Sequence, residues 1–270
     1  MKIFFSGGLP KSGSNMIKNV LSENDKISIC NYSSIGDALG TIKHCLFDYE
    51  KQKNRKITIF EESIKNFLKE GLNGWAKGFN PQSSVYIDDN RYWLGNLEDL
   101  QNIFNGKMIV FIRDIKSIIN SFENIHLNKI DYTRENIPET FYEYFPYNKQ
   151  LQRIMKYLNK DAIKIPLNGI HRIIEEKNKD NFYFIKYEDF VSNPNEELKN
   201  IYKFLDMPYF KHDLNNIKMS FDPPLCHLPW GDIRHFNNIE KLNTKNILNK
   251  ESIMYIETNF KWFYNFFYKK

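Results

Sequence analysis

A glycine-rich turn between a short apolar run and a helical pattern constrains this chain more than any other feature. The run at residues 3–5 is Ile-Phe-Phe, which favours a strand, and GGLPKSGSN follows at 7–15. Apolar residues then recur at helical spacing between positions 14 and 22. A helix N-terminus behind such a turn directs backbone N–H groups and the positive end of the helix dipole at one point. We therefore predict an anion-binding turn here, the alternative being a plain strand-to-helix connection.

The residues of this turn suit an anion but depart from the Walker pattern. Gly13 lets the backbone approach the anion closely, Ser12 and Ser14 offer hydroxyl donors, and Lys11 can reach the bound group. Aligned on Gly13, the pattern G-x-x-x-x-G-K-[ST] needs a lysine where Ser14 stands and a hydroxyl where Asn15 stands. The hydroxyl that would bind magnesium is therefore missing, and we expect the anion to be held without a metal.

A second motif, KMIVFIRDIKSIINSF at 107–122, combines a strand with a helix. Arg113 ends the strand, and Ser121 follows eight residues later, roughly two helical turns on. The two side chains can therefore face the same point. Arginine suits phosphate because its planar fork donates two charge-assisted hydrogen bonds. The alternative is a solvated arginine and a serine on a helix surface.

The pattern of the whole chain predicts an α/β protein with three layers and a mainly parallel sheet. Strands separated by helices connect through right-handed crossovers, which gives parallel pairing. The predicted strands lie at 2–6, 26–30, 84–88, 107–113 and 182–186. The predicted helices lie at 14–22, at 59–70 with Gly71 as a C-cap, from Pro194 until Pro208 with a buried stripe of Leu198, Ile201, Tyr202 and Leu205, and around 253–263.

Residues 1–270 are predicted to form a single domain, because no linker divides them. Residues 135–180 contain helix formers and aromatics without a strand signal, so we expect a helical subregion over one edge of the sheet. Residues 221–247 contain three prolines and little periodicity, which predicts a long loop over the site. We expect loops at 31–58, 71–83 and 131–170 to build any second substrate pocket.

Composition narrows the class of partner. The net charge of +5 comes from 38 basic and 33 acidic residues that are interspersed, which favours a pocket for a small anion and gives no basic stripe for nucleic acid. Three cysteines show no CxxC pairing, no apolar run is long enough to span a membrane, and the N-terminus lacks a signal-peptide pattern. We expect a cytoplasmic protein without a disulfide framework or a zinc site.

GLPKSGSN and the Arg113 motif together resemble the sulfotransferase family, whose loop reads roughly G-x-P-[KR]-S-G-[ST]-[ST]. The resemblance implies 3'-phosphoadenosine 5'-phosphosulfate (PAPS) as donor, with its bisphosphate product PAP, and no metal. Its phosphosulfate end would contact Lys11, Ser12, Gly13, Ser14 and Asn15, although Asn15 replaces a hydroxyl residue of the family pattern.

The same resemblance assigns roles to residues farther along the chain. Arg113 and Ser121 match the family's 3'-phosphate site, and Tyr187 in FIKYEDF matches the tyrosine near the adenine. Arg234 in CHLPWGDIRHF resembles a phosphate contact in the family's late segment, which closes over the nucleotide. DDNRYW at 88–93 is similar to Asp-Lys-x-Arg-x-Trp of bacterial-type members, with Asp89 in place of the lysine.

The implied reaction moves a sulfuryl group to a hydroxyl of a small molecule, a carbohydrate or a peptide. Lys11 would stabilise the charge on the leaving oxygen, and a carboxylate or histidine would take the acceptor's proton. Asp88, Asp89 and His227 are candidates for this base, with Asp88 ranked ahead of His227 because it ends a strand where open α/β sheets bind ligands. A P-loop small-molecule kinase and a non-catalytic nucleotide-binding protein are the alternative functions.

Overall fold

A parallel sheet of five strands forms the centre of the computed structural model, which describes residues 1–53, 57–128, 148–176, 179–218, 238–239 and 245–269. Its strand order is β2-β3-β1-β4-β5, and each neighbouring pair is parallel. The strands are β1 (Lys2–Gly8), β2 (Ile27–Asn31), β3 (Val85–Asp89), β4 (Met108–Ile112) and β5 (Phe182–Lys186). All five predicted strands are confirmed to within two residues at each end.

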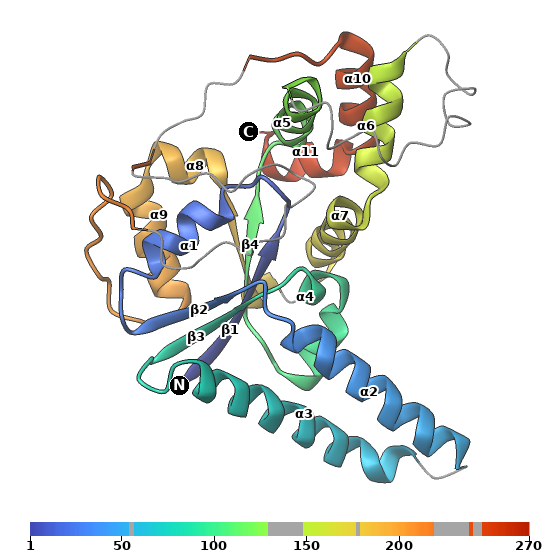
Figure 1. The fold of residues 1–270 in the computed structure, drawn as a ribbon, viewed down its shortest axis with the longest axis vertical. Helices are drawn as coiled ribbons and strands as arrows, with labels where there is room; N and C mark the ends of the chain where they lie inside the picture. The colour runs from blue at the N-terminus through green and yellow to red at the C-terminus, as the bar shows by residue number, and fades with distance from the viewer. Residues whose placement is uncertain (54–56, 129–147, 177–178, 219–237, 240–244, 270) are drawn as a thin grey trace.

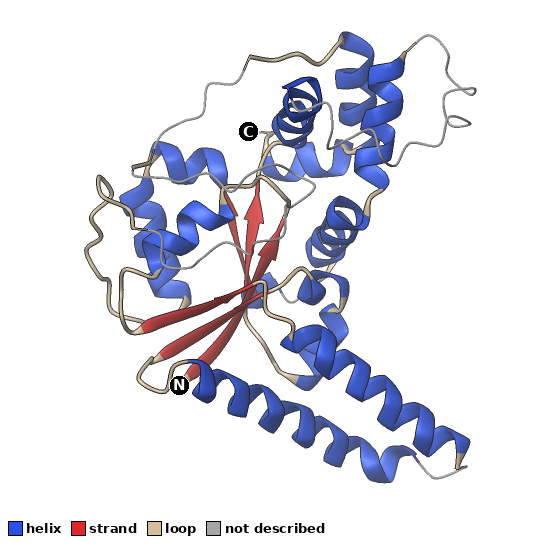
Figure 2. Ribbon diagram, viewed as in Figure 1, coloured by secondary structure: helices blue, strands red, loops and turns tan. Residues whose placement is uncertain are grey.

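Helices cover both faces of the sheet, which confirms the three-layer α/β architecture (Figures 1 and 2). One face carries α1 (Ser14–Leu21), α8 (Tyr187–Ser192) and α9 (Pro194–Phe204). The other carries α4 (Tyr92–Gly95), a π-helical turn (Asp99–Ile103), α5 (Ile115–Asn128), α6 (Lys149–Asn159), α7 (Asp161–Glu175), α10 (Lys250–Asn259) and α11 (Lys261–Phe267).

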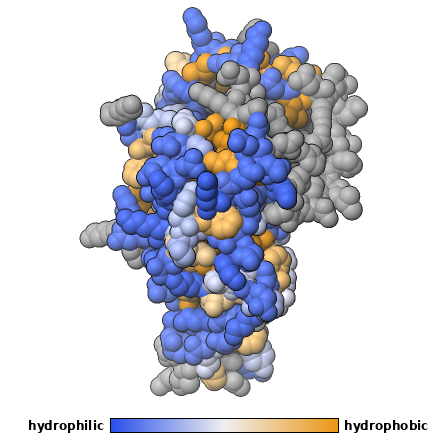
Figure 3. Space-filling model, turned by 90° about the vertical axis from the view of Figure 1, so that its left-hand side faces the viewer, coloured by the Kyte–Doolittle hydropathy of each residue, from blue (hydrophilic) through white to orange (hydrophobic). Residues whose placement is uncertain are grey.

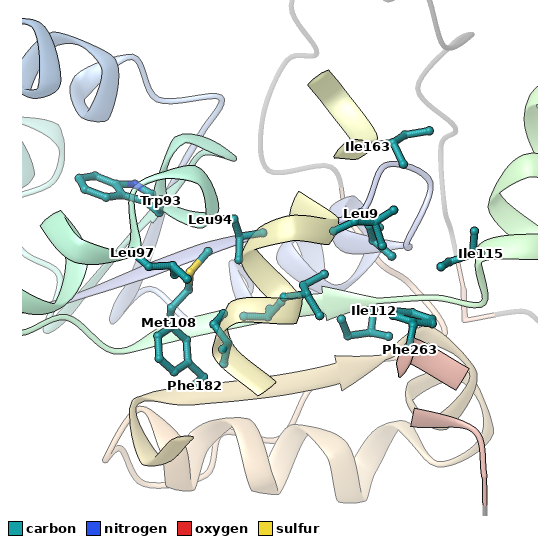
Figure 4. Packing of buried hydrophobic residues seen from close by; sticks show 14 of the residues in the cluster. Leu9, Trp93, Leu94, Leu97, Met108, Ile112, Ile115, Ile163, Phe182 and Phe263 are labelled. Carbon is teal, nitrogen blue, oxygen red and sulfur yellow. The ribbon is translucent and has the colours of Figure 1, made fainter. Parts of the chain in front are cut away.

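Two apolar layers arise because neighbouring side chains of a strand point to opposite faces. In β1, Phe4 packs with the α1 side while Phe5 packs with the other. In β4, Phe111 and Ile112 divide in the same way. Figure 4 shows the larger layer, where side chains from β4, α4, α7, β5 and α11 meet. Each of these strands therefore packs against helices on both faces of the sheet. The carboxyl ends of the strands remain as the place where a ligand can bind.

The segment between β2 and β3 differs from the prediction. It forms two long helices, α2 (Ile35–Gln52) and α3 (Ile57–Phe79), which extend from the sheet as a hairpin (Figure 1). The predicted end of a helix at Gly71 is wrong, because Leu72 and Ala76 continue the buried face and outweigh the cost of about 1 kcal/mol for a glycine inside a helix. Most of 31–58 and 71–83, expected as loops, is therefore helical.

The rest of the chain largely follows the prediction. Within 135–180, the described part contains α6, α7 and a 3-10 turn (Lys179–Asn181), whereas 135–147 and 177–178 lie outside the described residues. The single helix predicted at 253–263 is two helices, α10 and α11, separated at Phe260. Most of the loop predicted at 221–247 also lies outside the described residues.

Helix α9 starts at Pro194 and buries the predicted stripe, but it ends before Pro208. Asp206 takes a left-handed φ of 52°, and the N–H groups of Asp206 and Met207 donate to the carbonyls of Lys203 and Tyr202 at 3.1 and 3.0 Å. This pattern is a Schellman cap, so local backbone bonds end the helix and the proline does not.

The outer surface near α9 is mostly hydrophilic, with scattered apolar residues (Figure 3). In the part of the chain that the structure describes, no helix is both long and apolar enough to cross a membrane.

Candidate active site

The loop between β1 and α1 lies at the carboxyl end of the central strand. A Cβ atom on Gly8 would come within 2.4 Å of the Phe111 carbonyl oxygen, so only glycine fits beside β4. Lys11 and Gly13 both hold left-handed backbone angles, with φ of 58° and 78°, and Gly13 is the N-cap of α1. The loop therefore turns tightly into the helix N-terminus, the arrangement that favours anion binding.

Two buried donors at this loop have no hydrogen-bond partner among the residues that the structure describes. Ser12 is 1% exposed and its Oγ is unpaired; Arg113, at the end of β4, is 7% exposed and its Nε is unpaired as well. Buried polar atoms are normally satisfied, so unpaired ones call for an explanation. Both groups donate hydrogen bonds, which an anionic ligand accepts.

The end of β4 and the start of α8 meet the loop directly. Arg113 donates from Nη1 to the Lys11 carbonyl oxygen at 2.6 Å, and its guanidinium carbon lies 4.4 Å from the centre of the Tyr187 ring. A Cβ atom on Gly13 would lie 2.5 Å from Cδ2 of Tyr187. Three segments far apart in the sequence are therefore brought together, and their roles toward a nucleotide stay predictions. Ser121 lies in the second turn of α5 and is half-buried.

Two neighbouring carboxylates at the end of β3 point to opposite faces of the sheet. Asp88 is 0% exposed, and it accepts hydrogen bonds from Tyr86 Oη at 2.8 Å and from Trp93 Nε1 at 2.7 Å. Burial raises the pKa of Asp88. Asp89 accepts from Ser6 Oγ and forms an ion pair with the buried Lys18. Both carboxylates are thus committed to internal partners.

The family model for the sulfotransferase family matches residues 4–211. The chain belongs to the sulfotransferase family. Among solved structures it is similar to the sulfotransferase domain from the curacin biosynthetic pathway, with TM-score 0.53 and 15% identity over 96% of this chain and 97% of that one. It is also similar to the sulfotransferase domain of the Synechococcus PCC 7002 olefin synthase, with TM-score 0.51 and 17% identity over 96% and 94%.

A third structure, retinol dehydratase in complex with androsterone and inactive cofactor PAP, has TM-score 0.40 and 15% identity over 78% of this chain and 62% of that one. The likeness to the curacin and olefin synthase domains shows a shared fold. No curated protein matches the sequence.

The described part of this sulfotransferase does not favour Asp88 as the general base. Asp88 was ranked first from its place at a strand end, but its complete burial and its two hydrogen bonds are those of a structural carboxylate, so the geometry argues against that role. The bond to Trp93 also explains why the first and last residues of DDNRYW belong together. His227 and Arg234 lie outside the described residues, and their roles stay predictions.

An exposed carboxylate that the sequence analysis missed stands at the same edge. Asp37 lies in the first turn of α2, and its Oδ2 accepts a hydrogen bond from Asn90 Nδ2 at 2.9 Å. Asn90 is joined to the central strand, because its backbone N–H donates to the Ser6 carbonyl at 3.0 Å. The signal for Asp37 was weak, since the segment that carries it was expected to be a loop. In the first turn of α1, Nδ2 of Asn15 donates to Tyr32 Oη at 3.2 Å.

A brace from the C-terminal helix holds the turns on which Arg113 and Tyr187 stand. Asp114 accepts from Tyr264 Oη at 2.8 Å, and Glu188 accepts from Tyr268 Oη at 3.0 Å. Glu188 also accepts from the Asp114 backbone N–H at 3.1 Å, so the two turns are joined to each other. No motif in the sequence indicated this brace.

Among the described residues, no three His, Cys, Asp or Glu side chains gather as metal ligands would. Binding without a metal stays a prediction.

Proposed function

We propose that this sulfotransferase moves a sulfuryl group from PAPS to a hydroxyl of an acceptor. The observation that carries the proposal is the meeting of the β1–α1 loop, Arg113 and Tyr187, with two buried donors left unpaired between them. An adenine nucleotide with phosphate groups at both ends of its ribose needs these features together, namely an anion cradle, a second cation and an aromatic surface.

The chemistry of the residues at this site is that which PAPS would require. The N–H groups and hydroxyls of 12–15 would hold the phosphosulfate, and Arg113 with Ser121 would hold the 3'-phosphate. Tyr187 would lie beside the base. Arg113 has one further duty, because Nη1 also fixes the Lys11 carbonyl, which leaves Nε as a donor for the ligand. When bound, the donor supplies an activated sulfuryl group whose bridging bond to the 5'-phosphate breaks as the acceptor oxygen attacks.

Lys11 and the loop amides would stabilise the negative charge that grows on the leaving oxygen. Fixed donors aimed at developing charge need little reorganisation during the reaction, and one such donor is worth roughly a hundredfold or more in rate. The left-handed backbone of Lys11 and its anchored carbonyl hold the start of this side chain in one place.

We propose that Asp37 is the general base that takes the proton from the acceptor hydroxyl. Among the described carboxylates on the β2–β3 side of this edge, Asp88 is fully buried and Asp89 is paired with Lys18, whereas Asp37 is exposed and held by Asn90. A general base must reach the hydroxyl that it deprotonates, so exposure at the sheet edge is the deciding property.

The test begins with nucleotide binding. We expect PAP to raise the melting temperature of the protein at concentrations where ATP with magnesium does not. Arg113→Met should weaken the binding of PAP by about tenfold or more. The binding of adenosine 5'-phosphosulfate, which lacks the 3'-phosphate, should weaken by less. Selective stabilisation by ATP with magnesium would instead favour a kinase.

The second step measures transfer of labelled sulfate from PAPS to a mixture of hydroxyl compounds, carbohydrates and peptides. Transfer of the label by the unmodified protein that is lost in Lys11→Met would support sulfotransferase activity. Tight PAP binding without transfer to any acceptor or to water would make the chain a non-catalytic nucleotide-binding protein.

A further inference from the structure

Arg91 follows β3 at the carboxyl edge of the sheet, and its guanidinium has no hydrogen-bond or ion-pair partner in the part of the chain that the structure describes. The side chain is half-buried in the turn before α4, and none of the described residues accepts a hydrogen bond or forms an ion pair with it. Its nearest titratable neighbours are Asp89 and Tyr32. The charge of Asp89 raises the pKa of Arg91, but Asp89 is shared with Lys18 and Ser6 and accepts no hydrogen bond from the guanidinium.

A partly buried guanidinium without a hydrogen-bond partner is costly, and this cost indicates a ligand. Arginine stays charged under nearly all conditions, and its five N–H donors have no acceptor of their own. Burial lowers the pKa of Arg91, because the charged form loses hydration that the nearby charge of Asp89 only partly replaces. A bound anion would supply both the missing charge and the missing acceptors.

The strand order indicates whether this anion belongs to the donor nucleotide or to the acceptor. β1, which carries the loop, has β4 on one side and β3 on the other. Arg113 at the end of β4 and Tyr187 after β5 form the nucleotide half of the proposed site. Arg91 stands across the loop from them, next to Asn90, whose carbonyl oxygen would lie 3.1 Å from a Cβ atom on Gly7. The acceptor must approach from this side, because the nucleotide occupies the other.

Tyr32 marks the rim of the same half. It follows β2, is 42% exposed and holds a left-handed φ of 56°, an uncommon conformation for such a bulky residue. Contacts with Asn15 and with the ammonium of Lys18, 5.4 Å from the ring centre, keep it there. Strained residues held by several contacts are typical of binding sites.

We propose that Arg91 binds a carboxylate, phosphate or sulfate group of the acceptor, so that the substrate of this enzyme is a hydroxyl compound carrying a negative charge. This inference rests on the proposed function, because it places the acceptor relative to the nucleotide. Arg91 would then be a binding residue that selects the acceptor, distinct from the groups that act on the donor.

The test uses protein saturated with PAP and two matched pairs of probes in calorimetric titrations. The pairs are 4-hydroxybenzoate with its methyl ester, and glycerol 3-phosphate with glycerol. We expect the anionic member of at least one pair to bind about 10- to 100-fold more tightly than its neutral partner, the range for a charge-assisted bidentate contact.

Three variants locate the effect. Arg91→Met should erase the difference within the pair, and Arg91→Lys should keep part of it, since a lysine retains the charge without the fork. Arg172→Met removes an exposed arginine of α7 and should change nothing. Circular dichroism and melting temperature check that each variant is folded.

Equal binding of both members of each pair to the unmodified protein would overturn the proposal. A loss of PAP affinity in Arg91→Met would also overturn it, because Arg91 would then hold the donor's phosphates. Slower hydrolysis of PAPS by water in that variant, with unchanged probe binding, would place Arg91 on the sulfuryl group. A failure of the proposed function is separate, since the unmodified protein would then not bind PAP at all.

Discussion

Two residues of the β1–α1 loop hold left-handed backbone angles for different reasons. Gly13 does so without steric cost, and its missing side chain leaves room for the Tyr187 ring. Lys11 pays about 1 kcal/mol or more for the same region, and the Arg113 bond to its carbonyl helps to offset that strain. A costly conformation at this lysine is understandable if its ammonium must point at one atom.

Replacing Lys11 with methionine should therefore affect the chemical step far more than nucleotide binding. Lys11→Met keeps the side-chain length and the backbone strain while it removes the charge. We expect turnover to fall about 100-fold and PAP affinity to fall less than tenfold, because the charge matters most as the leaving oxygen becomes negative. Single-turnover rates and calorimetry measure the two effects, with Lys77→Met on the exposed side of α3 as a control. Equal losses would contradict the assignment.

The buried Asp88 should make stability depend on pH. Burial raises its pKa in the folded state above the unfolded value of about 3.9, so the native protein holds this proton more tightly. The free energy of unfolding should therefore fall as pH rises from about 4 through the folded-state pKa, by at most about 1.4 kcal/mol per pH unit. Urea unfolding across pH should show this slope in the unmodified protein and a flatter curve in Asp88→Asn.

Activity separates the structural role of Asp88 from that of a base. If Asp88 only supports Trp93 and Tyr86, Asp88→Asn should retain turnover within about tenfold, whereas Asp37→Asn should lower it about 100-fold. A hundredfold loss in Asp88→Asn with unchanged PAP affinity would return the role to Asp88.

At the scale of elements, the features that could be predicted from the sequence are those that local patterns determine, above all the strands. Each strand is a short apolar run with clear breakers, so all five could be placed, and the spacing of Arg113 and Ser121 followed from strand and helix geometry. The α2–α3 hairpin could not be read in the same way, because Gly71 is a stop signal only when nothing packs against the next turn. Here its Cβ position lies 3.4 Å from Leu39 of α2, and close packing continues the helix.

A buried ion pair joins α5, which carries Ser121, to α6. Arg153 donates from Nε and Nη2 to the two carboxylate oxygens of Glu123, at 3.0 and 2.7 Å, and the Glu123 side chain is 0% exposed. Arg153→Met should destabilise the protein by about 3–5 kcal/mol, because it leaves a carboxylate buried without its partner. Denaturant unfolding measures the loss.

The double variant Glu123→Met/Arg153→Met is the matched control for this pair. It removes both charges and should recover much of the lost stability, since the desolvation cost disappears with them. Additive losses in the double variant would mean that the two residues act independently.

At the scale of the whole molecule, the C-terminal helix completes a site whose motifs lie far earlier in the chain. Tyr264 is 150 residues from Asp114, and Tyr268 is 80 residues from Glu188. Contacts at such separations leave no local pattern, so sequence reasoning found Arg113 and Tyr187 but not what holds them. The same reason explains why Asp88 was ranked as a base, since neither its depth nor its two donors could be read from its position in a strand.

The double variant Tyr264→Phe/Tyr268→Phe tests whether this brace supports nucleotide binding. It removes two hydroxyl donors and keeps both rings, so the apolar packing of α11 should survive. Asp114 and Glu188 would each lose one hydrogen bond, and the turns that present Arg113 and Tyr187 would become less constrained. We expect PAP affinity to fall by roughly 2- to 30-fold, the range for residues that act through their neighbours.

Calorimetry with PAP measures this effect, and Tyr49→Phe, which removes an exposed hydroxyl from α2, is the control. The melting temperature should fall as well, because two partly buried hydrogen bonds to carboxylates are lost. The decisive comparison is with adenosine, which would use the Tyr187 surface but neither phosphate site. If Tyr264→Phe/Tyr268→Phe lowered the melting temperature but left the affinity for PAP unchanged, the brace would stabilise the fold without positioning the site. A loss confined to PAP would locate its effect at Arg113, and a loss shared with adenosine would extend it to Tyr187.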